Sequence, residues 1–448
     1  MQDVLQRYFN VRRDELLPIL MAALYFFFIL TALMVLRPTR DALGMQRGIE
    51  EVRWLFMGTL VATLAVNPLF SLLVSRFRRL VFISATHAFF IVNLLLFCAL
   101  LVFAPQAVGE RTGQVFYVWM SVFNLFVTMV FWALMADRFS LEQSKRLFGI
   151  IAVGGTVGAV AGSSLAWALA NVLGAPMLLI VASAFLLLAT GAAWAVALLK
   201  PETRHATRDR EDPPAVAEHA IIGGNAWEGM RAVFRSPYLL GIAAFVLILA
   251  VLVTFIYFTR LQMVAALGDD VNMQTGVFAQ LDLATQVATL VLQLIVAGHI
   301  MKRFGVSVAM ALLPMIVAIG FIGLAIIGSL VALVLLDATQ RAVQRAIMRP
   351  ARETLWTVVT REEKYKAKAF IDTFGYRAGD AVGAQTEGLL GRLGMGLYGL
   401  ASVAVPLALV WAALGIWLGR QQARLARAQD RPVEAEAPGE VPQPEAAR

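Results

Sequence analysis

The chain has 448 residues, of which 59% are hydrophobic and 15% charged, and its formal net charge is +8. Soluble domains carry roughly 45–50% apolar and roughly 25% charged residues, so this composition excludes a soluble domain and predicts many membrane spans. The basic excess does not indicate nucleic acid, because the bases stand in short loops between apolar runs, where membrane orientation explains them. A single cysteine, Cys98, excludes a disulfide framework and a multi-cysteine metal site.

The apolar runs predict twelve transmembrane helices, since each crossing of the hydrocarbon layer needs about 20 residues. The first run follows a basic N-terminus, but it is long and lacks a small-residue cleavage site, so we interpret it as a retained span. The windows fall near residues 15–36, 54–74, 80–103, 115–135, 147–170, 175–199, 238–259, 276–299, 306–327, 329–350, 368–391 and 396–418.

A polar segment divides these windows into two sets of six. It contains KPETRHATRDREDPPAVAEHA and is followed by NAWEGMRAVFRSP, which we expect to form a short helix at the membrane interface. The C-terminal stretch EAEAPGEVPQPEAAR has little to bury and is predicted to be disordered. The expected organisation is an N-terminal six-helix half (1–200), a cytoplasmic linker (201–235), a C-terminal six-helix half (236–419) and a disordered tail (420–448).

Bases gather after the second, fourth, sixth, eighth, tenth and twelfth windows, on the side of the N-terminus. The positive-inside rule therefore predicts that both termini face the cytoplasm, and we expect a multi-pass protein of the bacterial inner membrane. The region after the first window is an exception on the opposite side, because it carries Arg37, Arg40, Arg47 and Arg53.

Two windows carry matching glycine triplets. Gly154, Gly158 and Gly162 in the fifth window recur as Gly375, Gly379 and Gly383 in the eleventh. Each triplet lies on one helical stripe, where small residues let two helices approach closely, so we assign all six glycines to helix packing. Their repetition predicts an all-α membrane protein of two related six-helix halves. This arrangement resembles the major-facilitator fold, in which a ligand site lies near the midplane between the halves.

Charged side chains stand inside the eleventh window, where each costs about 2.5–3.5 kcal/mol at a helix centre. Asp372, Tyr376 and Asp380 share a stripe, and Arg377 lies within i, i+3 reach of Asp380. Two interpretations stay open: Asp380 neutralises Arg377 as a structural pair, or it titrates during function.

The tenth window repeats Asp337, Arg341, Arg345 and Arg349 at intervals of four. Its bases either snorkel at a helix end that leaves the membrane or line a wet cavity, and Asp337 could simply neutralise Arg341. We expect Arg341 to line one central cavity together with Arg40 and Arg377. The candidates for a coupling site that binds an ion or proton are Asp337, Asp372 and Asp380.

No hydrolytic, nucleotide-loop or metal-binding motif is present, and the glycine-rich run GIIAVGGTVGAVAG sits within an apolar helix. We therefore expect neither an enzyme nor a cofactor.

The segments LRPTRDALG, FWALMAD, RLFGIIAVGGTVGAVAG and REEKYKAKAFIDTFGYRAGDAVGA resemble the ATP/ADP translocase family of plastids and obligate intracellular bacteria, more closely its bacterial nucleotide-exchange relatives. The resemblance covers essentially all twelve windows. It implies a major-facilitator fold and the exchange of nucleotide di- and triphosphates without hydrolysis.

By this resemblance, Arg40 with Asp41 corresponds to a lysine–aspartate pair of the family, and Lys368 with Asp372 to the segment that opens the eleventh span. Two positions depart from the pattern: Asp380 stands where the translocases have lysine, and the acidic residue of their fourth span is replaced around Met120. An anion still fits the arginines, because guanidinium groups pair bidentately with phosphate oxygens. The expected substrate-binding residues are Arg40, Asp41, Arg341, Arg345, Lys368, Asp372, Tyr376 and Arg377.

The first functional hypothesis is a monomeric secondary transporter that exchanges or co-transports an organic anion, nucleotide-like by resemblance. The second is a proton-coupled carrier of another phosphorylated or amphiphilic anion. A non-transporting scaffold or sensor is disfavoured, because a scaffold has no reason to keep charges inside its spans.

Overall fold

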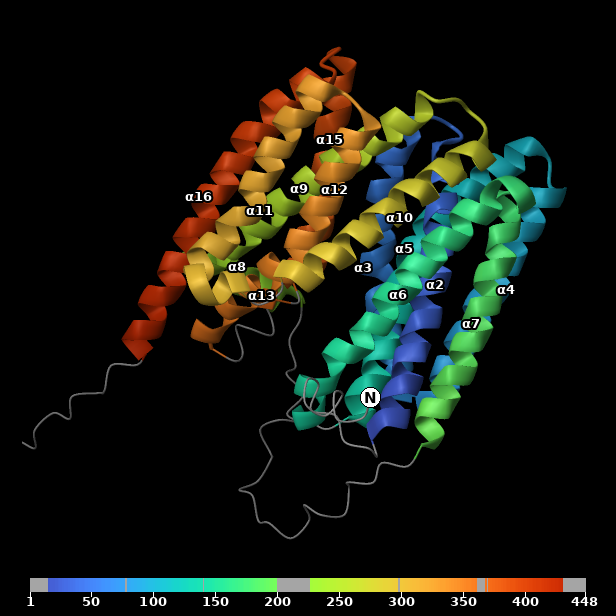
Figure 1. Ribbon diagram of the computed structural model, residues 1–448, viewed down its shortest axis with the longest axis horizontal. Coiled ribbons are helices and arrows are strands. Elements are labelled where there is room, and N and C mark those ends of the chain that lie inside the picture. Colours follow the sequence, from blue (N-terminus) through green and yellow to red (C-terminus); the bar gives the residue numbers. More distant parts are fainter. Residues whose placement is uncertain are drawn as a thin grey trace, which may run out of the picture.

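The computed structural model describes residues 15–76, 79–139, 141–199, 226–296, 299–360, 367–368 and 370–429, and in that part every regular element is helical. The N-terminal half forms one bundle, coloured blue to green in Figure 1. Its helices are α2 (Leu16–Met45), α3 (Ile49–Arg76), α4 (Arg79–Phe103), α5 (Gln106–Arg138), α6 (Leu141–Leu173) and α7 (Ala175–Leu198).

The C-terminal half forms a second bundle beside the first, coloured yellow-green to red in Figure 1. Its long helices are α9 (Pro237–Ala265), α10 (Val271–Val296), α11 (His299–Ile327), α12 (Leu330–Val343), α15 (Tyr376–Arg392) and α16 (Leu397–Gln429). Two π-helical turns interrupt the regular pattern, Gln344–Met348 after α12 and Ile371–Gly375 before α15. The short helix α13 (Arg349–Thr354) and a 3-10 turn (Leu355–Val358) follow the first of them.

The six-plus-six division expected from the apolar windows is therefore present in the described residues. The short helix α8 (Ala226–Arg235) falls where an interfacial helix was expected, whereas residues 201–225 of the expected linker lie outside the described part. The boundary of the tail needs correction, because α16 continues to Gln429 and so includes the first ten residues, 420–429, of the expected tail. The segment after Arg420 is rich in Gln, Ala, Leu and Arg, which favour helix. Residues 430–448 lie outside the described part.

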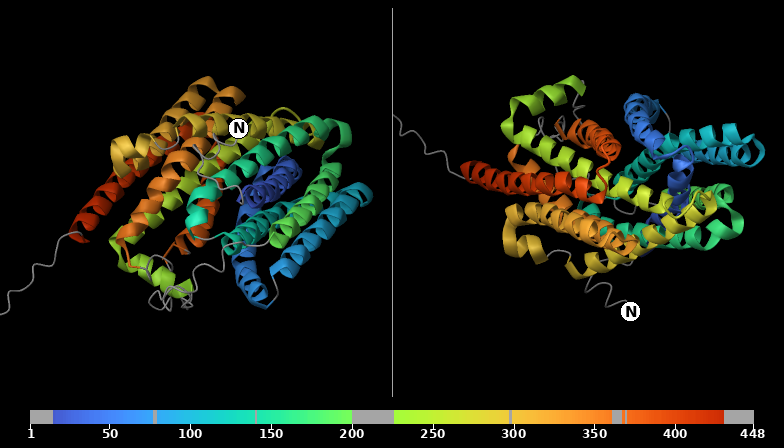
Figure 2. Two further views of the ribbon diagram at one scale, coloured as in Figure 1. Left: turned by 60° about the horizontal axis from the view of Figure 1, so that its bottom comes forward. Right: turned by 90° about the horizontal axis from the view of Figure 1, so that it is seen from above.

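Eight of the described helices are long and apolar enough to cross a membrane by themselves: α2, α4, α5, α6, α7, α9, α11 and α16. The other four long helices are α3, α10, α12 and α15. Of these, α12 has 14 residues and α15 has 17, so they are short for a span. Helices of the two halves meet across the interface, where α3 contacts α15 and α10 contacts α6 and α2. Figure 2 shows the two bundles side by side from two further directions.

A glycine seam joins α6 to α2 in the N-terminal half. A Cβ on Gly154 would stand 2.5 Å from the carbonyl oxygen of Ala23, and one on Gly162 would stand 2.5 Å from that of Thr31. Between them, a Cβ on Gly158 would overlap the carbonyl oxygen of Phe27. The backbones of the two helices are thus in direct contact along two turns, which requires glycine at each position.

The C-terminal half repeats this seam between α15 and α9. A Cβ on Gly379 would lie 2.7 Å from the carbonyl oxygen of Leu247, and one on Gly383 would lie 2.9 Å from Cβ of Thr254. Gly375 does not belong to the seam, because the nearest atom to its Cβ position is 3.9 Å away in Ile371. The assignment of Gly375 to helix packing is therefore corrected. Gly375 ends a π turn, and the changed helical register there moves it off the stripe.

Ion pairs close the interface at one end, where the α2–α3 turn and the α15–α16 turn meet; we call this the closed end. Arg53 of α3 is 5% exposed and lies 2.8 Å from the buried carboxylate of Glu387 on α15. Gln262 of α9 donates a hydrogen bond to the other oxygen of Glu387. A Cβ on Gly388 would fall 2.6 Å from Cδ of Arg53, so glycine makes room for this side chain. The cavity described below lies between the halves on the inner side of this contact.

The seam geometry predicts that Gly158→Ala destabilises the protein, whereas Gly375→Ala does not. The added methyl at 158 has to push α6 away from α2, and overpacking of this kind costs about 1–3 kcal/mol. The thermal unfolding midpoint of each variant in detergent, followed by intrinsic fluorescence, measures the difference. Equal midpoints for the two variants would mean that α6 and α2 are not in backbone contact.

Candidate functional site

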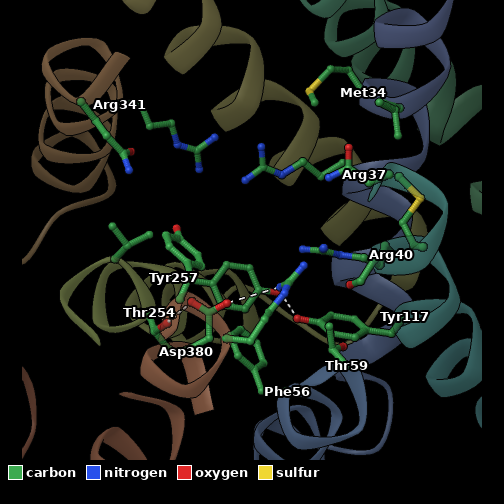
Figure 3. Close-up of a pocket in the computed structure, with 18 of the residues that line it drawn as sticks. Met34, Arg37, Arg40, Phe56, Thr59, Tyr117, Thr254, Tyr257, Arg341 and Asp380 are labelled. Carbon is green, nitrogen blue, oxygen red and sulfur yellow. Dashed lines mark hydrogen bonds and ion pairs between the residues drawn. The ribbon is translucent and has the colours of Figure 1, made fainter. Parts of the chain in front are cut away.

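A cavity of about 400 Å³ lies between the two halves, and Figure 3 shows side chains from both of them pointing into it. Among the described residues, six arginines line it together with a single carboxylate, that of Asp380. Aromatic and small polar groups complete the wall. The charged lining residues are Arg37 and Arg40 of α2, Arg341 of α12, Arg345 of the first π turn, Arg349 of α13, and Arg377 and Asp380 of α15.

The π turn after α12 explains how three arginines at intervals of four reach one cavity. In a regular α-helix each four-residue step overshoots a full turn by about 40°, so Arg341, Arg345 and Arg349 would drift off one face. The π turn lengthens one turn by a residue, with the amide of Arg349 bonded to the carbonyl of Gln344, and so keeps them together. Pro350 favours this local change, because it lacks an N–H and clashes with the carbonyl four residues earlier.

Asp282 of α10 compensates the charge of three arginines from different helices. Its carboxylate is fully buried and accepts a hydrogen bond of 2.8 Å from Arg260 of α9. Arg37 of α2 lies 3.8 Å away and Arg341 of α12 lies 3.9 Å away. Because Arg37 belongs to the N-terminal half and Asp282 to the other, this pair also connects the halves. We call Asp282 and these three arginines the central ion cluster.

Asp41 plays a similar part on α2. It is fully buried, lies 2.5 Å from Arg40, and accepts a hydrogen bond of 2.9 Å from the hydroxyl of Tyr257 on α9. Its second oxygen makes no hydrogen bond within the described residues, and the same holds for the second oxygen of Asp282. Both carboxylates therefore keep free acceptor capacity next to the arginines.

Aromatic rings form one side of the cavity near Arg40. The hydroxyls of Tyr117 and Tyr257, one from each half, are 2.9 Å apart, and the Arg40 guanidinium lies 4.7 Å from the centre of the Tyr117 ring. Phe56 stands 5.5 Å from Tyr257, centre to centre. Figure 3 shows Phe56, Tyr117 and Tyr257 on the same side of the cavity as Asp380, opposite Arg37 and Arg341.

Asp380 is held by two groups. Arg377 donates a hydrogen bond of 3.3 Å to one of its oxygens, and Thr254 of α9 donates one of 3.3 Å to the other. The pair expected from the i, i+3 spacing is therefore formed. Arg377 keeps 29% of its side chain exposed, so it can also reach a ligand in the cavity.

The structure separates the residues expected at the site into two groups. The expectation that Arg40, Arg341 and Arg377 share one cavity agrees with the structure, and Arg345 and Tyr376 join them. Asp41 and Asp337 stand directly behind the wall, where Asp337 lies 2.8 Å from Arg341.

Lys368 and Asp372 do not line the cavity. Lys368 lies 2.5 Å from Glu353 and Asp372 lies 3.2 Å from Arg352, so both make partly exposed ion pairs with α13. The π turn at Ile371–Gly375 rotates this segment away from the face that carries Arg377.

Four important residues were not among those expected. The sequence shows Asp282 as a carboxylate inside an apolar window and Arg37 as a base beside Arg40, but it does not indicate that these two side chains pair with each other. Arg260 ends an apolar run and looks like an ordinary helix-end base. Tyr257 carries no sequence signal that distinguishes it from a tyrosine at the membrane interface.

Two six-helix bundles around a central polar cavity define the class of this protein, a multi-pass membrane transporter that alternates access to one site. The family comparison agrees: the chain belongs to the Major Facilitator Superfamily, whose model matches residues 16–340. It is therefore a secondary transporter of the major-facilitator type and not an enzyme.

Solved structures show the same fold at low sequence identity. A bacterial homologue of the human lysosomal transporter Spinster, in an inward-facing and unoccupied conformation, has 13% identity and a TM-score of 0.52 over 93% of this chain and 99% of its own. A mutant form of the nucleoside transporter NupG has 13% identity and a TM-score of 0.53 over 92% and 100%. The peptide transporter PepTSo of the POT family has 13% identity and a TM-score of 0.59 over 92% and 98%. No curated protein matches the chain.

The central ion cluster predicts a large loss of stability for Asp282→Asn. Removing its charge leaves Arg260, which is 2% exposed, with a buried cation that is no longer balanced. Breaking such a pair costs on the order of 3 kcal/mol, whereas Asp372→Asn, in a partly exposed pair, should cost about 1 kcal/mol or less. The thermal midpoints of the two variants in detergent test this, and Asp282→Asn should be partly rescued by also introducing Arg260→Met. Equal midpoints would show that Asp282 does not balance the cluster.

Proposed function

We propose that this transporter carries a multiply charged organic anion, nucleotide-like in its chemistry, and that it works by exchange. The observation that carries the proposal is the lining of the cavity, to which the described residues contribute six arginines and one carboxylate. A neutral or cationic substrate would find no use for that excess of positive charge.

The arginines suit phosphate or carboxylate groups in particular. Each guanidinium offers a planar fork of N–H donors that pairs with two oxygens of one phosphate. Arg37 and Arg341 approach the cavity from different halves and lie 3.8 Å and 3.9 Å from Asp282. Arg341 uses its Nε to bond Asp337, so its terminal guanidinium nitrogens and the Arg37 guanidinium are the groups that would bind a ligand. An anion between them would bind both halves at once.

The aromatic side of the cavity suits a planar ring. The rings of Tyr117 and Tyr257 lie against the Arg40 guanidinium, and Phe56 neighbours both rings. Flat apolar groups gain from stacked or edge contacts with such rings. A substrate with a ring at one end and phosphates at the other would match both sides. The resemblance of four sequence segments to the ATP/ADP translocases supports the same substrate class.

Exchange follows from the charge of the empty cavity. Uncompensated cations are costly in the low dielectric of a membrane protein, so closing the halves around an empty arginine-lined site is unfavourable. A bound anion removes this cost. The carrier therefore reorients more readily loaded than empty, which couples outward movement of one anion to inward movement of another.

A proton-coupled carrier is the second candidate. The observation in its favour is Asp380, the one carboxylate that lines the cavity within the described residues. In this version Asp380 binds the proton while an anion binds the arginines. For the orientation we propose that both termini lie in the cytoplasm, because the bases gather in the loops on the side of the N-terminus. The bacterial inner membrane and a monomeric state remain expectations.

Uptake into liposomes containing the purified protein tests the proposed substrate class and exchange. Labelled nucleoside, nucleoside monophosphate, diphosphate and triphosphate are offered with and without unlabelled anion inside. We expect uptake of the phosphorylated compounds only, and at least several-fold more of it with internal anion. Equal uptake of the neutral nucleoside would overturn the anion proposal, and uptake indifferent to internal anion would overturn exchange.

Arg37→Gln should lower the apparent affinity for the transported anion about tenfold or more, since it removes charge-assisted hydrogen bonds from a low-dielectric site. Arg392→Gln is the matched control, because Arg392 is 61% exposed and lies outside the cavity at the closed end. Half-saturation concentrations from liposome uptake compare them. An unchanged value for Arg37→Gln would remove this residue from the binding site.

Asp380→Asn separates exchange from proton coupling. If Asp380 only balances Arg377, the variant yields less folded protein, and Arg377→Gln in addition restores the yield. If Asp380 binds the coupling proton, the variant folds normally and loses the dependence of uptake on a pH gradient. Folded yield from size-exclusion chromatography and gradient-driven uptake are measured for both single variants and the double variant. Normal yield with unchanged pH dependence contradicts both roles.

A further inference from the structure

A second and larger space lies outside the substrate cavity, in a groove between α3, α4 and α5. Its volume is about 980 Å³ and its lining is almost wholly apolar. Several lining side chains are strongly exposed, among them Val81 (54%), Phe89 (59%) and Val115 (60%). A groove of this kind in a membrane protein opens to the hydrocarbon layer.

The groove and the substrate cavity share the wall formed by α5 but use opposite faces of it. Tyr117, Met120 and Asn124 face the cavity, whereas Val118 and Val122 face the groove. The same holds for α3, where Phe56 lines the cavity and Leu55 lines the groove. The groove is therefore separate from the substrate cavity, although helices α3 and α5 contribute to the walls of both.

Two buried hydrogen-bond donors among the lining residues have no partner in the described part of the chain. They are Nε2 of Gln114 and Nε1 of Trp119. The indole of Trp119 is fixed, since it stacks on the ring of Phe123 at 5.3 Å. A buried donor without an acceptor is destabilising, so these two groups call for an acceptor that the described residues do not supply.

Positive charge stands at the end of the groove that carries Gln114. Arg47, in the turn between α2 and α3, is exposed and donates a hydrogen bond of 3.4 Å to the side-chain oxygen of Gln114. Arg111, one helical turn before Gln114 on α5, is also exposed. These bases belong to the side of the membrane that the positive-inside rule leaves poor in arginine, so orientation does not explain them.

From these observations we propose that the groove binds one diacyl phospholipid with an anionic headgroup. The phosphate pairs with Arg47 and Arg111, because basic pockets between membrane helices bind anionic headgroups. The ester carbonyl oxygens accept hydrogen bonds from Gln114 and Trp119. An acyl chain then lies along α5 from Val115 towards Phe126.

The length of the groove agrees with this placement. The lining residues of α5 run from Gln114 to Phe126, a helical rise of about 18 Å. One leaflet contributes about 15 Å of the hydrocarbon layer, half of its total thickness. The groove therefore accommodates one acyl chain within the leaflet at the closed end.

Photo-crosslinking tests the proposal on the full-length protein in nanodiscs. Two probes carry the same diazirine on an acyl chain, one with a phosphatidylglycerol headgroup and one with a phosphatidylcholine headgroup, and labelled peptides are mapped by mass spectrometry. We expect labelling concentrated on the groove residues of α3, α4 and α5, several-fold stronger with the anionic probe. Labelling spread evenly over all lipid-facing helices, or equal with both probes, would overturn the proposal.

Variants separate the headgroup contact from the acyl contact. Arg47→Gln with Arg111→Gln should abolish the preference for the anionic probe, whereas Arg424→Gln with Arg427→Gln on α16 should keep it. Val118→Trp fills the groove and should remove labelling there, whereas Ile319→Trp, at a position 64% exposed on α11, should not. Thermal midpoints confirm that each variant is folded. If the Arg47 and Arg111 variant keeps its preference for the anionic probe, the labelled lipid is ordinary surface lipid and the proposed headgroup site is wrong.

Discussion

Cations buried inside a membrane protein need a compensating charge, and in this chain the carboxylate of Asp282 provides it for three of them. It lies within 4 Å of arginines on α2, α9 and α12, so it ties the first span of each bundle to the fourth span of the second. The rest of the site depends on this balance. With Asp282 and Asp41 partly committed to Arg260 and Arg40, the remaining guanidinium groups keep unused donors that face the cavity.

The arrangement of the helices was readable from the sequence to a large extent. Apolar windows of membrane length predicted the spans, and the glycine triplets predicted close helix packing at Gly154, Gly158, Gly162, Gly379 and Gly383. Both signals are local, because span length and small-residue spacing act within one helix. The π turns were not predictable, since Pro350 alone does not show how the helix before it will adapt. They moved Gly375 off its expected stripe and Lys368 and Asp372 away from the cavity.

The composition of the site was harder to predict than its location. Charge at membrane depth indicated Arg40, Arg341, Arg345 and Arg377 because such charges are rare. Arg260 and Asp282 are equally charged and equally central, yet their pairing joins α9 to α10, and only the folded structure places them together. The contact between Tyr117 and Tyr257 could not be predicted either, because their hydroxyls meet across the interface of the two halves.

Alternating access requires the contacts between the halves to break in turn, and two of the ion pairs among the described residues differ in how they could do so. At the closed end, the buried side chains of Arg53 and Glu387 pair with each other, Arg53 also pairs with Glu50, and Gln262 donates a further hydrogen bond to Glu387. At the centre, Arg37 and Asp282 form a loose pair at 3.8 Å. A bound anion can therefore take the place of Asp282 as the partner of Arg37. In the proposed function, an anion bound to Arg37 weakens one link between the halves while it creates another through Arg341. Arg53 and Glu387 do not line the cavity, so in the proposed function the binding energy gained at the centre drives the opening of the closed end.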